Sequence, residues 1–187
     1  MRLFVAVVPP ADVLVQIGQL IEKLRPLAPR SKWISANGAH VTLAFLGERN
    51  LEFVSQLCAA VAKTAEQHSP FHVRFNRLGA FGRGRRARVL WLGTEQGRDA
   101  FTALYHGLNQ HLAELGYTPD KPSFEPHITL SRARDPKGDR DLTSASESTQ
   151  CGDLGEWTVS ELVIYESVLT PKGPLYTAVD SAALSGG

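Results

Sequence analysis

The sequence predicts an α+β fold with two pseudo-symmetric lobes, whose antiparallel sheets are flanked by helices and face each other across an active-site cleft. Strand-like and helix-like segments alternate along the chain, the motif His-x-Thr-Leu occurs twice, and the two halves match at a nearly constant offset. A chain of 187 residues with 43% hydrophobic and 21% charged residues is long enough to bury its own core. We therefore expect a single bilobed domain over residues 1–187.

The first half of the chain predicts three strands and two helices. Two prolines follow an initial apolar run and precede apolar residues at helical spacing, namely Val13, Ile17, Leu20, Ile21 and Leu24. Asn50 is a preferred N-cap residue before the second helix. In order, we expect a strand over 2–8, a helix over 9–27, a strand over 40–47, a helix over 51–67 and a strand over 71–81.

The second half predicts a similar order of elements. The stretch GRGRR at 82–86 supplies turn residues between two strands, so we expect a solvated hairpin tip. After it we expect a strand over 87–94, a helix over 100–116, a strand over 127–133, a loop over 135–149 with a helical turn near 142–148, a strand over 156–169, a turn at 170–174 and a strand over 175–179. The tail SAALSGG is small and polar and is expected to fray.

The two halves look like copies of one unit. RLFVAV matches RVLWLG, FHVRFNRLGAF matches EWTVSELVIYES, and His127 follows His40 by 87 positions. Two copies are too few for a solenoid. We expect an internal repeat over roughly 1–85 and 86–180, with each copy forming a similar lobe.

The composition excludes several classes of protein. A formal net charge of +1 gives no global attraction to nucleic acid or membranes, so an anionic ligand must be held by a local arrangement. Cys58 and Cys151 have neither metal-ligand nor redox spacing and suit reduced thiols. The initial apolar run is too short for a membrane span and lacks a signal-peptide cleavage site. We expect a cytoplasmic monomer with no membrane partner.

The repeated motif predicts a polar surface on each strand, because side chains alternate between the two faces. One face of the first copy carries His40, Thr42 and Ala44, and the other carries Val41, Leu43 and Phe45. The second copy places His127, Thr129 and Ser131 on one face. If the copies face each other, two histidines and two threonines line the cleft, and the small residues leave room for a ligand.

Two histidines beside one ligand favour paired acid–base catalysis, since imidazole titrates near neutral pH. Each such role typically contributes on the order of 10²–10⁴ in rate. The threonine hydroxyls can donate to the non-bridging oxygens of a phosphodiester. The set therefore suits in-line displacement at phosphorus, with water on one side and a departing alkoxide on the other.

The motifs HVTL and HITL resemble the paired H-x-T motifs of the 2H phosphoesterase superfamily. RLFVAVVPP, Trp33, LGAF followed by RVLWLG, FEPHITLSRAR and LVIYESVLTPKGPLY extend the resemblance to the RNA 2′,3′-cyclic phosphodiesterases, also called 2′-5′ RNA ligases. The resemblance implies metal-independent hydrolysis of a 2′,3′-cyclic phosphate at an RNA end, tRNA halves being one candidate, to a 2′-phosphomonoester, without a cofactor. Ligation would be the same chemistry with a 5′-hydroxyl nucleophile.

The resemblance also implies a role for each motif residue. His40 would be the proton donor to the 3′-oxygen and His127 the proton acceptor from water, while Thr42 and Thr129 would hold the phosphate. The two copies alone do not distinguish acid from base. A basic residue follows the second motif in the family, which suggests Arg132 as a substrate-binding residue.

Several alternatives remain open at this stage. Strict alternation places Arg132 opposite His127, so either the strand bends near Ser131 or Arg132 is structural. Trp33 and Phe45 could stack on a base or belong to the core. The four histidines outside the motifs are expected to be surface or packing residues, and the arginines of the 82–86 turn could contact RNA phosphates. The substrate could also be a small cyclic nucleotide or an ADP-ribose cyclic phosphate, or the protein could be a non-catalytic RNA-end-binding module.

Overall fold

The structure, a computed structural model, describes residues 1–119, 123–171 and 173–187. Its strands are β1 (Arg2–Val7), β2 (Lys32–Trp33), β3 (Val41–Glu48), β4 (Phe71–Arg83), β5 (Arg86–Gln96), β6 (His127–Arg132), β7 (Glu156–Val159), β8 (Glu161–Thr170) and β9 (Gly173–Ala183). Its helices are α1 (Ala11–Leu24), α2 (Leu51–Glu66), α3 (Arg98–Ala113) and α4 (Arg140–Ser148), with short 3₁₀ helices η1 (Arg25–Leu27) and η2 (Ala36–Gly38). The predicted alternation of strands and helices is confirmed.

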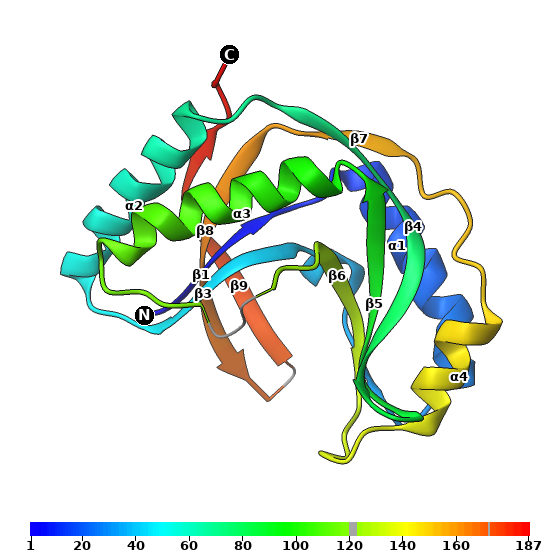
Figure 1. Cartoon of the computed structure of the whole chain (residues 1–187). Coiled ribbons are helices and arrows are strands. Elements are labelled where there is room, and N and C mark those ends of the chain that lie inside the picture. The colour runs from blue at the N-terminus through cyan, green and yellow to red at the C-terminus, as the bar shows by residue number, and fades with distance from the viewer. Residues whose placement is uncertain (120–122, 172) are drawn as a thin grey trace.

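The strands form one curled antiparallel sheet in the order β7-β4-β5-β6-β3-β1-β8-β9, with β2 added to β6 (Figure 1). This order is symmetric about the junction of β6 and β3, because β5 and β4 follow β6 as β1 and β8 follow β3. The third strand of each half joins the half-sheet of the other half, so β4 pairs with β5 and β8 pairs with β1. The predicted α+β class, with two antiparallel half-sheets flanked by helices, is therefore confirmed.

The helices cover the outside of the curled sheet. α2 and α3 pack together against the half-sheet of β3, β8 and β9, and α4 packs against β4 and β5 with α1 on the same side (Figure 1). The five apolar residues predicted for the first helix are its buried residues. Helices on the convex side leave the concave side of the sheet for a ligand. Of the helices in the described residues, none is long and apolar enough to cross a membrane.

The C-terminal tail differs from its prediction. Leu184 is 5% exposed, and the amides of Ser185 and Gly186 donate to the carbonyls of Ala65 and His68 at 3.0 and 3.1 Å. The tail therefore continues β9 onto the end of α2 instead of fraying. Its small residues allow close approach to the helix, which composition alone did not indicate.

Two further elements were incompletely predicted. α4 is a full helix whose N-cap, Asp139, accepts a hydrogen bond from the Asp141 amide at 3.0 Å, where only a helical turn was expected. The two-residue strand β2 is too short to produce a period in the sequence. The predicted turn at 170–174 includes residue 172, which lies outside the described residues.

Candidate active site

The five predicted site residues lie together in one cavity of about 780 Å³ on the concave side of the sheet. His40 and Thr42 come from the start of β3, and His127, Thr129 and Arg132 come from β6. The predicted cleft between the halves thus contains both copies of the motif. Further walls come from β1, β4, α3, β8, β9 and the segment before β6.

A single backbone register brings the two motifs together. The half-sheets meet where Val41 lies opposite Ile128 in an antiparallel pair. Antiparallel register extended by one residue in each direction sets His40 across from Thr129 and Thr42 across from His127. Because Val41 and Ile128 are fully buried on one face, the histidines and threonines share the other face, toward the cavity. Each histidine therefore faces the threonine of the opposite copy.

Both motif strands contain a β-bulge at the same position. Val5 and Ala6 of β1 pair with Ala44 and Thr42, which leaves Leu43 as an extra residue. Leu90 and Trp91 of β5 pair with Ser131 and Thr129, which leaves Leu130 as an extra residue. An extra residue shifts the alternation of side chains beyond it by one position.

The bulges place Phe45 and Arg132 at equivalent positions on the cavity side. Phe45 is 41% exposed, lines the cavity and stacks with Arg2, whose guanidinium carbon lies 5.0 Å from the ring centroid. The prediction that Phe45 shares a face with the buried Val41 and Leu43 is wrong. For Arg132, the strand bends before it, so this residue faces the cavity with His127.

The bulges also bury the two small residues that were predicted to leave room for a ligand. Ala44 is 2% exposed and Ser131 is fully buried, with its hydroxyl donating to the Lys32 carbonyl at 3.1 Å. Ser131 therefore packs the sheet, while Ala44, although nearly buried, still lines the cavity.

Both histidine rings are oriented through the same nitrogen. Nδ1 of His40 lies 2.8 Å from the Gly38 carbonyl oxygen, and Nδ1 of His127 lies 2.7 Å from that of Glu125. A carbonyl oxygen only accepts, so Nδ1 carries the hydrogen in both rings. Nε2 is then the atom at which each ring gains or loses a proton, which fixes the tautomer that acid–base chemistry needs.

Aromatic side chains complete the setting of each imidazole. Tyr176 meets the His40 ring edge-on at a centroid distance of 5.3 Å, and Phe81 meets the His127 ring edge-on at 4.9 Å. Phe4 lies 4.9 Å from the His40 ring. Their positions come from β1, β4 and β9, and no sequence pattern had singled them out as site residues.

The electrostatic environment disfavours protonation of His40 in the ligand-free cavity. Burial lowers the pKa of His40 below its usual 6.5, and the positive charges of Arg132 and His127 lower it further, against the hydrogen bond to the Gly38 carbonyl. In the ligand-free cavity, this shift favours the neutral form of His40 at pH 7. An anion in the cavity would offset the charge of Arg132 and raise this pKa.

Glu125 is a further cavity residue that sequence reasoning missed. Its carbonyl orients His127, while its carboxylate accepts hydrogen bonds from Arg77, at 2.8 Å, and from Arg98. The two arginines come from β4 and the start of α3. These ion pairs anchor the segment that carries His127. The sequence signal for Glu125 was its position two residues before His127.

The four other histidines have structural settings, as expected. His111 is buried and pairs with the Thr64 hydroxyl at 2.9 Å, and His68 is bonded through Nδ1 to the Thr64 carbonyl. Across the described ranges, no three His, Cys, Asp or Glu side chains come together as a metal site. Metal independence stays a prediction.

A curled antiparallel sheet with two H-x-T motifs in its cavity places this chain in the class of 2H phosphoesterases. The family model of the 2′-5′ RNA ligase superfamily matches residues 9–170, so the chain belongs to that superfamily. The RNA 2′,3′-cyclic phosphodiesterases of Thermus thermophilus and Thermotoga maritima are 32% and 30% identical to it, covering 100% of this chain and 91% and 97% of theirs.

The solved structures agree with this assignment. A crystal structure of a Thermus thermophilus protein aligns with a TM-score of 0.81 at 30% identity, covering 100% of this chain and 99% of that one. E. coli LigT complexed with 3′-AMP aligns with a TM-score of 0.79 at 27% identity, covering 98% of both chains.

Proposed function

We propose that this protein hydrolyses the 2′,3′-cyclic phosphate of an RNA end to a 2′-phosphomonoester, without a metal or cofactor. The observation that carries the proposal is the antiparallel register of Val41 and Ile128, which sets two imidazoles and two threonine hydroxyls around one space. The curated relatives above, which align along nearly their whole length, are named RNA 2′,3′-cyclic phosphodiesterases. We propose RNA ends such as those of tRNA halves as substrates and the monomer as the acting unit.

The proposed reaction needs one proton acceptor and one proton donor. Water attacks phosphorus while Nε2 of His127 takes a proton from it, and the bond from phosphorus to the 3′-oxygen breaks as Nε2 of His40 donates a proton to that oxygen. The product carries the phosphate on the 2′-oxygen. With a 5′-hydroxyl in place of water, the same steps form a 2′-5′ linkage.

Thr42, Thr129 and Arg132 are assigned to the phosphate in this scheme. The threonine hydroxyls donate to its non-bridging oxygens, whose negative charge grows in the transition state. Nη2 of Arg132 lies 3.5 Å from Oγ1 of Thr129, so its charge stands beside one of those hydroxyls. The bulge at Leu130 supports the assignment of Arg132, because it turns this side chain to the cavity.

The donor role of His40 requires that its imidazole take up a proton from solvent when the substrate binds. The neutral form of His40 is favoured in the ligand-free protein at pH 7, because burial lowers its pKa. A cyclic phosphate carries one negative charge, which counteracts Arg132 and favours the imidazolium. The substrate itself would thereby prepare the acid.

The test uses a synthetic oligoribonucleotide with a 2′,3′-cyclic phosphate end and identifies the product. The proposal expects a 2′-phosphate; a 3′-phosphate, or no turnover, contradicts it. The histidine roles are tested with a substrate whose 3′-oxygen is sulfur, because a thiolate leaves without protonation. That substrate should restore turnover to His40→Ala and not to His127→Ala, and the opposite result reverses the roles.

A further inference from the structure

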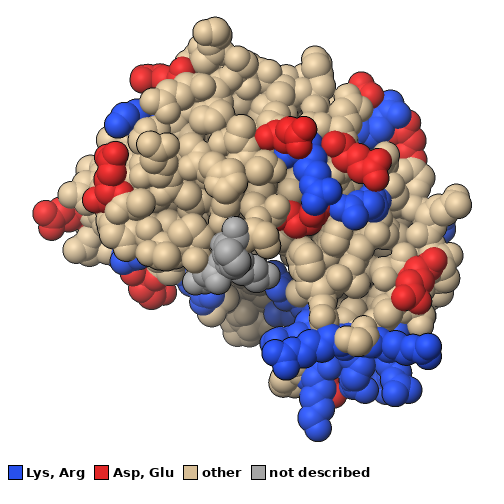
Figure 2. Space-filling view, in the orientation of Figure 1, with Lys and Arg blue, Asp and Glu red and all other residues tan. Residues whose placement is uncertain are grey.

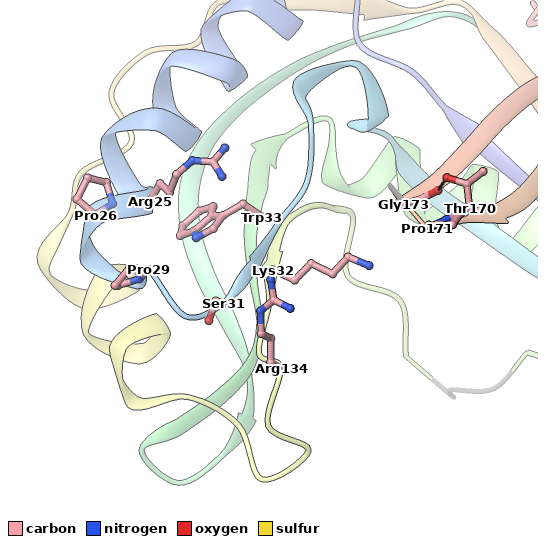
Figure 3. Close-up of a pocket in the computed structure, with 10 residues that line it drawn as sticks. All are labelled: Arg25, Pro26, Pro29, Ser31, Lys32, Trp33, Arg134, Thr170, Pro171 and Gly173. Atoms are coloured by element: carbon pink, nitrogen blue, oxygen red, sulfur yellow. Dashed lines mark hydrogen bonds between the residues drawn. The ribbon is translucent and has the colours of Figure 1, made fainter.

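A second cavity, of about 690 Å³, adjoins the catalytic one. One side is lined by Lys32 and Trp33 of β2, by Arg25 and by Arg134 just beyond β6, and the facing side by Thr170, Pro171 and Gly173 (Figure 3). Figure 3 shows the Lys32 and Arg134 side chains extending from these neighbouring segments into the open space. This cavity has no part in the scheme proposed above.

Neighbouring residues of the β2–β6 pair line the two cavities. Lys32 lies directly opposite Arg132, which lines the catalytic cavity. Residues directly opposite in an antiparallel pair present their side chains on the same face. On the facing side, Leu169 and Pro174 line the catalytic cavity, while Thr170 and Gly173 line the second one. A chain that leaves the catalytic cavity past Arg132 therefore enters the second cavity.

Three cations of this path lack acidic partners among the described residues, whereas Arg25 pairs with Glu22 at 2.9 Å. Lys32, Arg132 and Arg134 are exposed, and none forms an ion pair with the residues that the structure describes. Like charges directly opposite each other across two strands are destabilising. An anion shared between Lys32 and Arg132 removes this repulsion, so the arrangement suits a ligand with successive negative charges.

The facing side has a different chemistry. Leu169 of β8, which lines the catalytic cavity, is 68% exposed, and Pro171 and Pro174 continue this apolar surface along the two cavities. On the cationic side, the Trp33 indole is held by its N–H donating to the Ala28 carbonyl at 3.0 Å. A channel with cations and an indole on one side and apolar residues among those described on the other fits a single nucleic acid strand, which offers both phosphates and bases.

We propose that the second cavity binds the RNA strand leading to the reacting end, with Lys32 and Arg134 holding its backbone phosphates. The inference rests on the proposed function, since it takes the cyclic phosphate to lie beside Arg132. The basic surface continues beyond the cavity, because Lys and Arg gather over the β4–β5 hairpin and the β6–α4 loop (Figure 2). A protein with a net charge of +1 thereby presents a local cluster of cations at this end of the molecule (Figure 2).

The test compares a ten-nucleotide RNA that ends in a 2′,3′-cyclic phosphate with the corresponding mononucleotide. The variant Lys32→Ala/Arg134→Ala should reduce the ratio of their kcat/KM values roughly ten-fold at low salt, because only the longer substrate reaches the channel. Loss of two phosphate contacts should also make the plot of log kcat/KM against log salt shallower by about 1.4 for the longer substrate. The control Lys23→Ala/Lys63→Ala removes the same charge from exposed positions on α1 and α2 that line neither cavity.

An unchanged ratio, or an equal change in the control, overturns the inference. Fluorescence anisotropy with a labelled ten-nucleotide RNA ending in a 2′-phosphate separates this failure from failure of the proposed function. If the wild-type protein hydrolyses neither substrate, the proposed function is wrong. Weaker binding by Lys32→Ala/Arg134→Ala than by the control then still supports the channel, and equal binding refutes it.

Discussion

Replacing threonine by valine at three positions should separate catalysis from stability. Valine keeps the branched shape of threonine and removes only the hydroxyl. Thr42 and Thr129 are half-buried beside the histidines, and their hydroxyls are assigned to the phosphate. Thr64 is fully buried away from the cavity, where its hydroxyl donates to the Ala60 carbonyl at 2.8 Å and pairs with Nδ1 of His111 at 2.9 Å.

The expected magnitudes follow from these contacts. Thr42→Val and Thr129→Val each remove a hydrogen bond that strengthens in the transition state, which should lower kcat about 10- to 1000-fold. Their free energies of unfolding should change by no more than about 0.5 kcal/mol. Thr64→Val leaves buried His111 without its partner, which should cost about 1–3 kcal/mol. For a chain of this size, that loss corresponds to a Tm lower by about 2–12 °C.

The assay is turnover of a cyclic-phosphate RNA at 25 °C together with thermal unfolding of each variant. Thr64→Val should keep normal kcat where it is folded, while the cavity variants should keep normal Tm. If Thr42→Val and Thr129→Val lower Tm as much as Thr64→Val does, these threonines serve the sheet and not the phosphate. Normal kcat in both cavity variants also refutes the assignment.

Three further predictions concern metals, protonation and thiol chemistry. Activity should survive excess EDTA, and a loss restored by Zn²⁺ or Mg²⁺ would show that the histidines bind metal. The pKa of the His40 imidazole, followed by NMR, should lie below 6.5 in the free protein and rise when inorganic phosphate binds. Because the unfolded chain binds more protons at this site than the folded one, His40 should make the protein less stable as the pH falls below 6.5. A pKa at or above 6.5 in the free protein contradicts both expectations. Burial, followed by the interaction with Asp180, raises the pKa of Cys58 to about 11, so a thiol reagent at pH 8 should modify it far more slowly than it modifies the unfolded chain, and equal rates contradict this.

The elements of the fold were predictable where the sequence has a clear period or a strong terminating residue. The helical spacing in α1, the N-cap Asn50 and the basic turn between β4 and β5 all appear in the structure as expected. The C-terminal tail was not predictable, because its order comes from hydrogen bonds to Ala65 and His68, far away in the sequence. Local composition indicates only the conformational preference of the tail itself, whereas these hydrogen bonds depend on the position of the C-terminal end of α2.

The motif residues of the candidate site were predictable because a repeat doubles the signal of each residue. The sheet faces that Phe45 and Arg132 occupy were not predictable, since alternation of side chains holds only for regular strands and a bulge has no clear pattern in a single sequence. The residues that flank the histidines were also missed. Tyr176 and Phe81 approach His40 and His127 from strands whose pairing depends on the crossover of β8 and β4.

The repeat supplies the symmetry of the site, and the residues after each bulge break it. Phe45 and Arg132 occupy equivalent positions, yet one presents an aromatic ring and the other a guanidinium. Burial lowers the pKa of His40, and the charge of Arg132 in the opposite copy lowers it further. Two nearly identical strands thereby present different side chains to the cavity that their histidines share. Because Arg132 also lies opposite Lys32, the cation assigned to the reacting phosphate stands at the entrance to the proposed RNA channel.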